Sequence, residues 1–279
     1  MSSENQERDF ILINREIKRE LYYELSECVQ KNKKHKRCTI FLTTFGGDPH
    51  AAFRMGRCVR NSYRDHVRLV VPSFCKSAGT LFAICADELA VGDNGELGPL
   101  DVQVNKPDEL AERISGLDIL NTLTQIKEHS IRVFKEVLTS LRYGAGISTK
   151  LASQVAVEFA VGSAKSLYEQ IDQTRLSEVN RAMQIAMEYG TRLNEYGQNL
   201  KNESMRKLLL EYPDHSFVID RKEARDLFHR VSPLTDVEVS IYNKYVSNLF
   251  DPDNFFGPEY LSDDGGGDSN VRHSYKASE

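Results

Sequence analysis

Two glycine-bearing turns, each at the end of an apolar strand-like run, constrain the fold of this chain more than any other feature. The first turn, Phe45–Pro49, follows the run Thr39–Thr43, and the second, Lys76–Gly79, follows Val67–Val71. Each turn opens into a helix-like segment, so free backbone N–H groups and one serine hydroxyl are expected at the ends of neighbouring strands. Groups placed in this way can form an oxyanion site.

The residue types in the two turns suit acyl-transfer chemistry. Attack on a carbonyl builds negative charge on its oxygen, and one prearranged donor lowers that barrier by roughly 3–4 kcal/mol. Gly46 and Gly47 have no Cβ, so a substrate carbonyl can approach their backbone. Ser77 is expected to expose its hydroxyl beside the N–H of Ala78, as in a nucleophile elbow without the usual GxSxG spelling. A helix-capping serine and a plain Gly-Gly turn are the structural alternatives, but the paired arrangement favours a site.

The order of the elements predicts an α/β protein with a mainly parallel sheet. Strand-like runs alternate with helix-like segments in the first hundred residues, and longer amphipathic helices follow. Helix-like spacing is found over Gln6–Val29, Ala51–Tyr63, Ser77–Ala86, Ala111–Arg142, Ser148–Val161 and Leu176–Asn199, and strands are expected over Thr39–Thr44, Val67–Pro72 and Leu89–Val91.

The same turns carry a resemblance to a known superfamily. The segments Thr43–Asp48, Val71–Thr80, Ala86–Leu89, Leu97–Asp101 and Tyr212–Asp220 resemble the Clp/crotonase superfamily. Within it, the chain is most similar to the serine dehydrogenase proteinase family, which is related to signal peptide peptidase A and the Clp proteolytic subunit. The resemblance implies a ClpP/crotonase-like ββα spiral, a peptide or protein substrate and assembly into a homo-oligomer.

We expect three regions along the chain. Residues 1–37 are predicted to form an N-terminal helix and a basic connector, and residues 38–250 the catalytic domain, with a helical insertion at about 108–205. Residues 251–279 are predicted to be a disordered tail, because their Gly, Ser and charged residues offer little to bury.

The base that would activate Ser77 is not settled by the sequence. In the Clp subunit a histidine follows the short strand after the serine, but here Gly98–Gln103 contains none. His215 lies in the segment that in Clp supplies the acidic member of the triad, and we place it ahead of the lysines as a candidate. Lys127 is the lysine alternative, at a position similar to that of the lysine in some signal peptide peptidases. Asp101 could orient the base or only cap a turn.

Composition excludes several other classes of protein. A net charge of −5 gives no general attraction to nucleic acid. Five cysteines without CxxC spacing argue against a disulfide framework or a metal site. The polar N-terminus lacks the apolar core of a signal peptide, so we expect a cytoplasmic protein. No phosphate-binding GxxxxGK[ST] loop is present, so any ATP dependence would come from an ATPase partner, and whether an ATPase or membrane partner exists is unknown.

The sequence therefore predicts a serine hydrolase that cleaves peptide bonds through Ser77, without a cofactor. A crotonase-like acyl-CoA enzyme is one alternative, because it would use the same N–H pair to stabilise a thioester enolate. A catalytically degenerate scaffold that recruits partners is another, and the missing histidine after Gly98 favours it.

Overall fold

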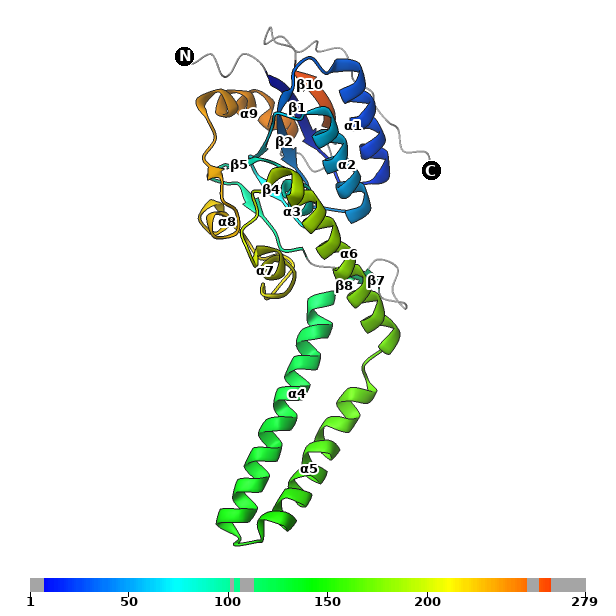
Figure 1. Cartoon of the computed structure of the whole chain (residues 1–279), viewed down its shortest axis with the longest axis vertical. Coiled ribbons are helices and arrows are strands. Elements are labelled where there is room, and N and C mark those ends of the chain that lie inside the picture. Colours follow the sequence, from blue (N-terminus) through cyan, green and yellow to red (C-terminus); the bar gives the residue numbers. More distant parts are fainter. Residues whose placement is uncertain (1–7, 101–102, 106–112, 250–255, 262–279) are drawn as a thin grey trace. The chain divides into compact units, whose positions relative to one another are not determined.

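The computed structural model describes residues 8–100, 103–105, 113–249 and 256–261 (Figure 1). The chain divides into two compact units. Unit 1 comprises Met1–Leu100 and Ala186–Glu279, and unit 2 comprises Asp101–Ile185.

A six-stranded sheet forms the centre of unit 1, in the order β10-β1-β2-β3-β5-β9. All neighbours pair in parallel except β10, which is antiparallel to β1. The predicted α/β class with a mainly parallel sheet is confirmed. The strands are β1 (Arg8–Asn14), β2 (Arg37–Thr43), β3 (His66–Val71), β5 (Glu88–Val91), β9 (Val231–Ser232) and β10 (Phe256–Leu261).

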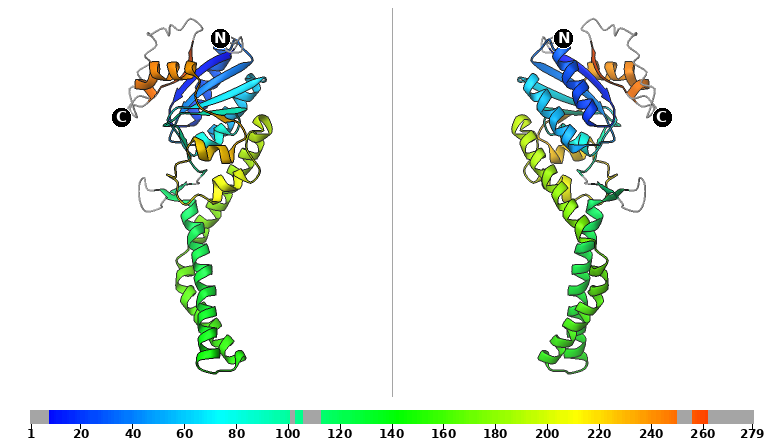
Figure 2. Two further views of the ribbon diagram at one scale, coloured as in Figure 1. Left: turned by 90° about the vertical axis from the view of Figure 1, so that its left-hand side faces the viewer. Right: turned by 90° about the vertical axis from the view of Figure 1, so that its right-hand side faces the viewer.

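Helices cover both faces of this sheet, which explains why the central strands are mainly apolar and do not alternate with polar residues (Figure 2). One buried row of register partners crosses four strands and packs against α9 (Asp236–Leu249): Leu12, Phe41, Val70 and Ala90. On the opposite face lie α1 (Arg19–Asn32) and α2 (Pro49–Ser62). The short helix α3 (Ala78–Ala83) packs against α2.

The helix predicted over Gln6–Val29 is wrong in its first part. Arg8–Asn14 forms β1, which lies between β2 and β10, and α1 begins only at Arg19. Because both faces of β1 are covered, its apolar run does not alternate with polar residues, and it resembles a continuation of the helical pattern that follows it.

The disorder predicted for residues 251–279 is also wrong for part of that segment. Phe256–Leu261 forms β10, whose Leu261 is the register partner of Phe10 in β1. The apolar and aromatic residues of this segment therefore add an edge strand to the sheet. Residues 262–279 lie outside the described residues.

Unit 1 also contains a small parallel sheet and two short helices. β4 (Phe74–Cys75) pairs with β6 (Glu96–Leu97), and the later part of the chain in this unit forms α7 (Ser204–Leu210) and α8 (Arg221–Leu227).

The insertion expected from the sequence extended to residue 205, but the last part of α6 (Gln173–Gly197) belongs to unit 1. There, the ring of Tyr189 stacks on Phe53 of α2, with centroids 4.1 Å apart.

Unit 2 is a helical hairpin made of α4 (Gly116–Thr139), a π-helical turn η2 (Ser140–Gly144) and α5 (Thr149–Glu169), with the β-ribbon β7 (Gln103–Asn105) and β8 (Arg113–Ser115). The buried stripe of α5 consists of four alanines at four-residue spacing: Ala152, Ala156, Ala160 and Ala164. Their small side chains allow α4 to pack closely against α5. Outside this stripe, Phe159 and Val161 are 61% and 60% exposed.

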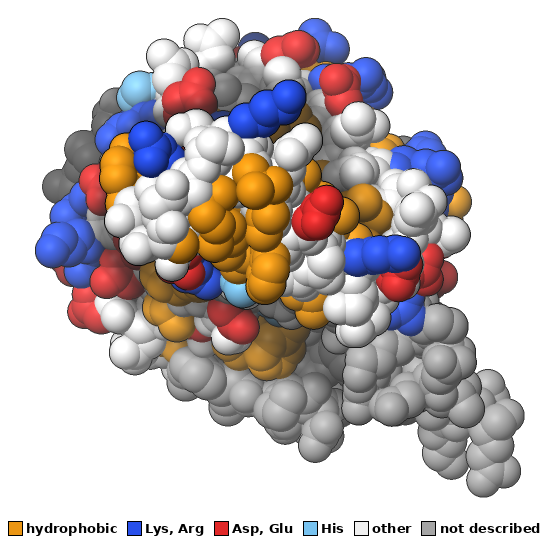
Figure 3. Space-filling model, turned by 90° about the horizontal axis from the view of Figure 1, so that it is seen from below, with side chains coloured by type: hydrophobic (Ala, Val, Ile, Leu, Met, Phe, Trp, Pro, Cys, Tyr) orange, Lys and Arg blue, Asp and Glu red, His pale blue; other side chains and the backbone are white. Residues whose placement is uncertain are grey.

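Figure 3 shows hydrophobic side chains gathered among charged ones on the face of the molecule seen from below.

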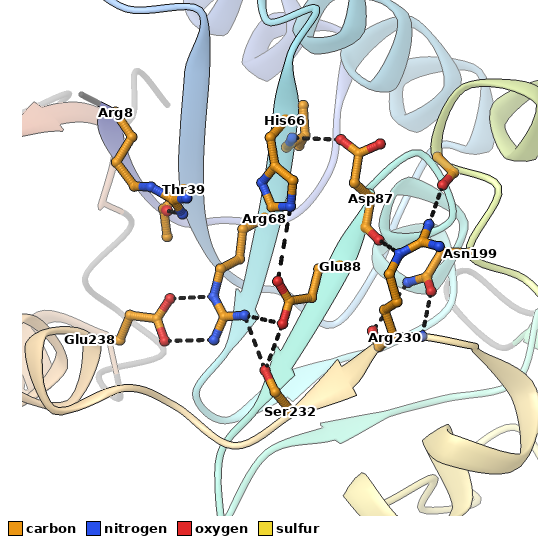
Figure 4. Close-up of polar contacts among 12 residues, drawn as sticks. Arg8, Thr39, His66, Arg68, Asp87, Glu88, Asn199, Arg230, Ser232 and Glu238 are labelled. Atoms are coloured by element: carbon orange, nitrogen blue, oxygen red, sulfur yellow. Dashed lines mark hydrogen bonds and ion pairs between the residues drawn. The ribbon is translucent and has the colours of Figure 1, made fainter. Parts of the chain in front are cut away.

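A buried ion network attaches α9 to the sheet (Figure 4). Arg68 of β3 donates from Nε to Glu238 Oε1 at 2.6 Å and from Nη2 to Oε2 at 3.0 Å. Its Nη1 lies 2.5 Å from Glu88 Oε1 in β5. Glu238 also accepts from the backbone N–H of Thr235, at 2.8 Å. Because the side chains of Arg68 and Glu238 are only 8% and 5% exposed, each charge depends on the other for solvation.

The substitution Glu238→Gln should therefore lower the free energy of unfolding by about 3–5 kcal/mol, since it leaves a buried guanidinium with an incomplete partner. Urea denaturation measures this change. The matched control is Glu188→Gln, which breaks an exposed pair with Arg192 and should cost less than about 1 kcal/mol. Equal effects of the two substitutions would contradict the role assigned to the buried pair.

Candidate active site

The structure brings the two glycine-bearing turns side by side. The N–H of Thr44, after β2, donates to the carbonyl of Phe74 at 2.9 Å, and the N–H of Lys76 donates to the carbonyl of Thr44 at 2.9 Å. These bonds continue the parallel pairing beyond the main sheet. They fix the Gly46 turn against the Ser77 turn.

Ser77 has an unusual backbone conformation for a residue with a side chain. It lies between β4 and α3 with φ 48° and ψ −111°, a region that costs a non-glycine residue on the order of 1–3 kcal/mol. Its carbonyl accepts the N–H of Leu81 at 3.0 Å, which ties the residue to the first turn of α3. The Ser77 side chain is half-buried, and its Oγ forms no hydrogen bond within the described part of the chain.

Gly46 and Gly47 are required by the close approach of neighbouring backbone. Both have positive φ, 110° and 134°. A Cβ on Gly46 would lie 2.9 Å from the Cβ of Ser77 and 3.3 Å from the N of Ala78. A Cβ on Gly47 would lie 2.2 Å from the carbonyl oxygen of Ile17. Gly46 therefore borders the serine and Ala78 directly.

Two backbone donors in the two turns have no acceptor among the described residues. The N–H of Gly46 donates to Thr44 Oγ1 at 3.1 Å. By contrast, no acceptor among the described residues takes the N–H of Gly47 or that of Ala78. Gly47 is also exposed, whereas Gly46 is buried. Of the two glycines, Gly47 is therefore the one that can donate to an added ligand.

Lys76, which precedes the serine, was not singled out from the sequence. Its side chain is only 12% exposed, and Nζ lies 2.8 Å from Glu96 Oε1. The same ammonium group donates to the carbonyls of Leu97 and Phe217, each at 3.3 Å. Lys76 thus joins three chain segments at the site. A charged residue between the apolar β4 and the Ser77 turn was the feature that could have drawn attention to it.

The segment that carries His215 reaches this region. Ile219 and Leu97 exchange backbone hydrogen bonds at 2.9 and 3.1 Å, two residues beyond the Phe217 carbonyl that binds Lys76. His215 itself is half-buried. The segment is therefore held beside the residue that precedes Ser77.

The Asp214 carboxylate is bound mainly by Ser216. Its Oδ1 accepts the N–H of Ser216 at 2.6 Å and also the hydroxyl of Ser216. These bonds to Ser216, with a smaller contribution from His215, lower the pKa of the exposed Asp214 carboxyl. The loop is thereby ordered by an Asp turn.

The other predicted residues lie elsewhere or outside the described part. Lys127 is an exposed residue of α4 in unit 2. Asp101 lies outside the described residues. Cys75 is fully buried in β4, and burial raises the pKa of its thiol far above the ordinary value, so the nucleophilic thiolate is strongly disfavoured.

The described residues contain no group of three or more His, Cys, Asp or Glu side chains that could hold a metal ion. Within the same ranges, no helix combines the length and the apolar composition that crossing a membrane requires.

Comparison with known proteins gives limited likenesses. No protein-family model matches the chain. An uncharacterized protein of Methanocaldococcus jannaschii is 29% identical over 83 residues, which are 30% of this chain and 29% of that protein. The chain thus matches less than a third of the length of this relative.

Two solved structures are similar in part. A mutant of the 1510-N membrane-bound stomatin-specific protease is similar over 53% of this chain and 69% of its own, with 16% identity and a TM-score of 0.35. A ClpP1 mutant from Listeria monocytogenes is similar over 52% of this chain and 77% of its own, with 19% identity and a TM-score of 0.25. At such TM-scores the likeness carries no conclusion about the activity of this chain.

The substitution Gly47→Ala should lower the free energy of unfolding by more than about 1 kcal/mol, because φ 134° is strained for alanine and the new Cβ meets the Ile17 carbonyl. Thermal or urea unfolding measures the loss. The control is Gly162→Ala on the exposed surface of α5, where no atom lies within 4 Å, and alanine should stabilise by about 0.5–1 kcal/mol. A neutral Gly47→Ala would show that the turn is not constrained as described.

Proposed function

We propose that unit 1 is a serine peptidase of the Clp/crotonase superfamily, with Ser77 as its nucleophile. One observation carries this proposal: a half-buried serine with a positive φ precedes the N–H of Ala78 and borders the turn that carries the N–H of Gly47, and neither N–H has an acceptor among the described residues. Backbone strain at a residue that bears a hydroxyl is typical of functional sites, because the surrounding fold has to support its cost.

We assign each group a role in peptide-bond cleavage. Ser77 Oγ attacks the scissile carbonyl, and the N–H groups of Gly47 and Ala78 donate to the oxygen as it becomes negative. Gly46 is assigned the part of a spacer, because its own N–H is bound to Thr44. The absent Cβ of Gly46 leaves room beside the serine.

A general base has to remove the proton from Ser77, because a serine hydroxyl is a weak nucleophile by itself. We assign this role to His215, whose segment is tied to Lys76 through the Phe217 carbonyl. Lys127, the lysine candidate from the sequence, belongs to unit 2, and Asp101 remains a candidate for orienting the base.

An exposed aromatic shelf beside the turn supports a peptide substrate. Phe45 is 65% exposed and stacks on Phe74, with ring centroids 4.0 Å apart and planes at 17°. Exposed apolar surface often marks the place where a protein binds a ligand. An extended peptide passing Gly47 could place an apolar side chain on this shelf.

A catalytically inactive scaffold is the second candidate function. It is favoured by the Oγ of Ser77, which binds no base within the described part of the chain. Catalytic hydrogen bonds are often formed only when substrate is present, so this observation does not outweigh the first.

A fluorophosphonate probe should label wild type once, as measured by intact mass, and should not label Ser77→Ala. His215→Ala should slow labelling by at least about a hundredfold if His215 is the base. The matched control is Ser73→Ala, a buried serine outside the turn, which should label like wild type. No adduct on folded wild type would overturn the peptidase proposal in favour of the scaffold, and rapid labelling of His215→Ala would exclude His215 as the base.

Assembly into a homo-oligomer through unit 2 is part of the proposed function. Phe159→Glu and Val161→Glu should each reduce the molar mass measured by light scattering, because these residues expose apolar surface on α5. Lys165→Glu is the control on the same helix, since Lys165 is 71% exposed. An unchanged mass for both apolar variants would exclude the exposed apolar surface of α5 as the interface.

A further inference from the structure

A cationic groove lies in unit 1 between α1, α2 and the last part of α6. Its volume is about 620 Å³, within the usual range of sites for small organic ligands. Three arginines and three aromatic rings line it: Arg19, Tyr22, Phe53, Arg54, Arg57 and Tyr189. None of these residues belongs to the Ser77 site.

The charge of the groove is not balanced by the protein. Within the described part of the chain, no acidic residue lines it and none of the three guanidinium groups forms an ion pair. The whole chain carries a net charge of −5, so this is a local concentration of positive charge on an acidic protein. An anion would find both charge and donors here.

Arg19 gives an independent indication of a missing ligand. Its Nη1 is buried and has no hydrogen-bond acceptor in the described structure. A buried donor without an acceptor is costly, and a buried charged donor more so. Arg19 also lines the groove, and a rotation of its side chain would bring Nη1 to a bound anion.

The aromatic side chains add flat apolar surface to the cationic one. The guanidinium of Arg54 lies 4.8 Å from the ring centre of Tyr22, and that of Arg57 lies 5.7 Å from the ring centre of Phe53. Phe53 and Tyr189 stack with planes at 8°. His50 Nδ1 lies 2.8 Å from the hydroxyl of Tyr189, which fixes that ring at the edge of the groove.

We propose that this groove binds a nucleotide, with the phosphates on the guanidinium groups and the base on the aromatic surface. Guanidinium forks match the geometry of phosphate oxygens, and a heterocyclic base can stack on aromatic rings or on guanidinium planes. A single inorganic phosphate would leave most of the groove empty and would not use the rings. The chain has no GxxxxGK[ST] loop, so the phosphates would be held by the arginine side chains and not by a loop of that type.

Calorimetric titration of the full chain with ATP, adenosine and tripolyphosphate tests this assignment. ATP should bind, and both adenosine and tripolyphosphate should bind at least about tenfold more weakly, because each lacks one half of the recognised chemistry. Arg54→Gln and Arg57→Gln should each weaken ATP binding by about tenfold. Arg64→Gln, an exposed arginine outside the groove with the same change of charge, should bind like wild type.

Arg19→Met provides a second test that does not depend on the exposed arginines. Methionine lacks the guanidinium group, so this variant should abolish ATP binding. Methionine also keeps an unbranched apolar stem and removes the unsatisfied buried donor, so the unfolding temperature of the ligand-free protein should not fall. Absence of ATP binding to wild type would overturn the proposal. Equal affinity for ATP and tripolyphosphate, or unchanged binding in the Arg54→Gln and Arg57→Gln variants, would overturn it as well.

Discussion

The backbone contact between Ile17 and the Gly46-Gly47 turn is the constraint on which the site depends. The N–H of Ile17 donates to the carbonyl of Gly46 at 2.7 Å, and the N–H of Asp48 donates to the carbonyl of Ile17 at 2.8 Å. No residue with a Cβ could replace Gly47 without moving this connection. The link between β1 and α1 thus fixes the first turn, and the first turn borders Ser77.

Buried polar contacts of Lys76 and Thr80 also hold the segments around Ser77 in place. The ammonium group of Lys76 binds Glu96 and two carbonyls, so it acts as a fixed connection between segments rather than as a mobile surface lysine. Thr80 has a similar effect on the other side of Ser77, since its hydroxyl donates to the Gly98 carbonyl at 2.8 Å and accepts the Gly98 N–H at 3.2 Å. Supporting bonds of this kind can offset the strain of a positive φ at Ser77.

The parts of the fold that follow from local chemistry could be predicted from the sequence. Gly46, Gly47 and Ser77 were recognisable because glycine and serine directly after two successive apolar runs favour tight turns at strand ends. β1 was missed because a strand covered on both faces shows no alternation, and the Leu21, Leu25 and Val29 spacing of α1 dominated the pattern.

Long-range pairings could not be predicted at all. Arg68 and Glu238 are separated by 170 positions. A single sequence gives no indication that these two charged residues form a buried ion pair. The contact of Lys76 with Phe217, across 141 positions, is of the same kind. The candidate nucleophile and its donors were therefore accessible from local sequence, whereas the groups that hold the segment of the proposed base beside them were not.

Helix α2 connects the Ser77 site to the cationic groove. Its N-cap is Asp48, whose carboxylate accepts the N–H of His50 at 2.8 Å, and Asp48 directly follows Gly47. The same helix contributes Phe53, Arg54 and Arg57 to the groove. A ligand that contacts α1, α2 and α6 together would restrict the motion of α2, and with it the turn that presents the Gly47 N–H. If the two sites are coupled in this way, the coupling is reciprocal, and a substrate bound at the turn would favour the occupied groove to the same extent.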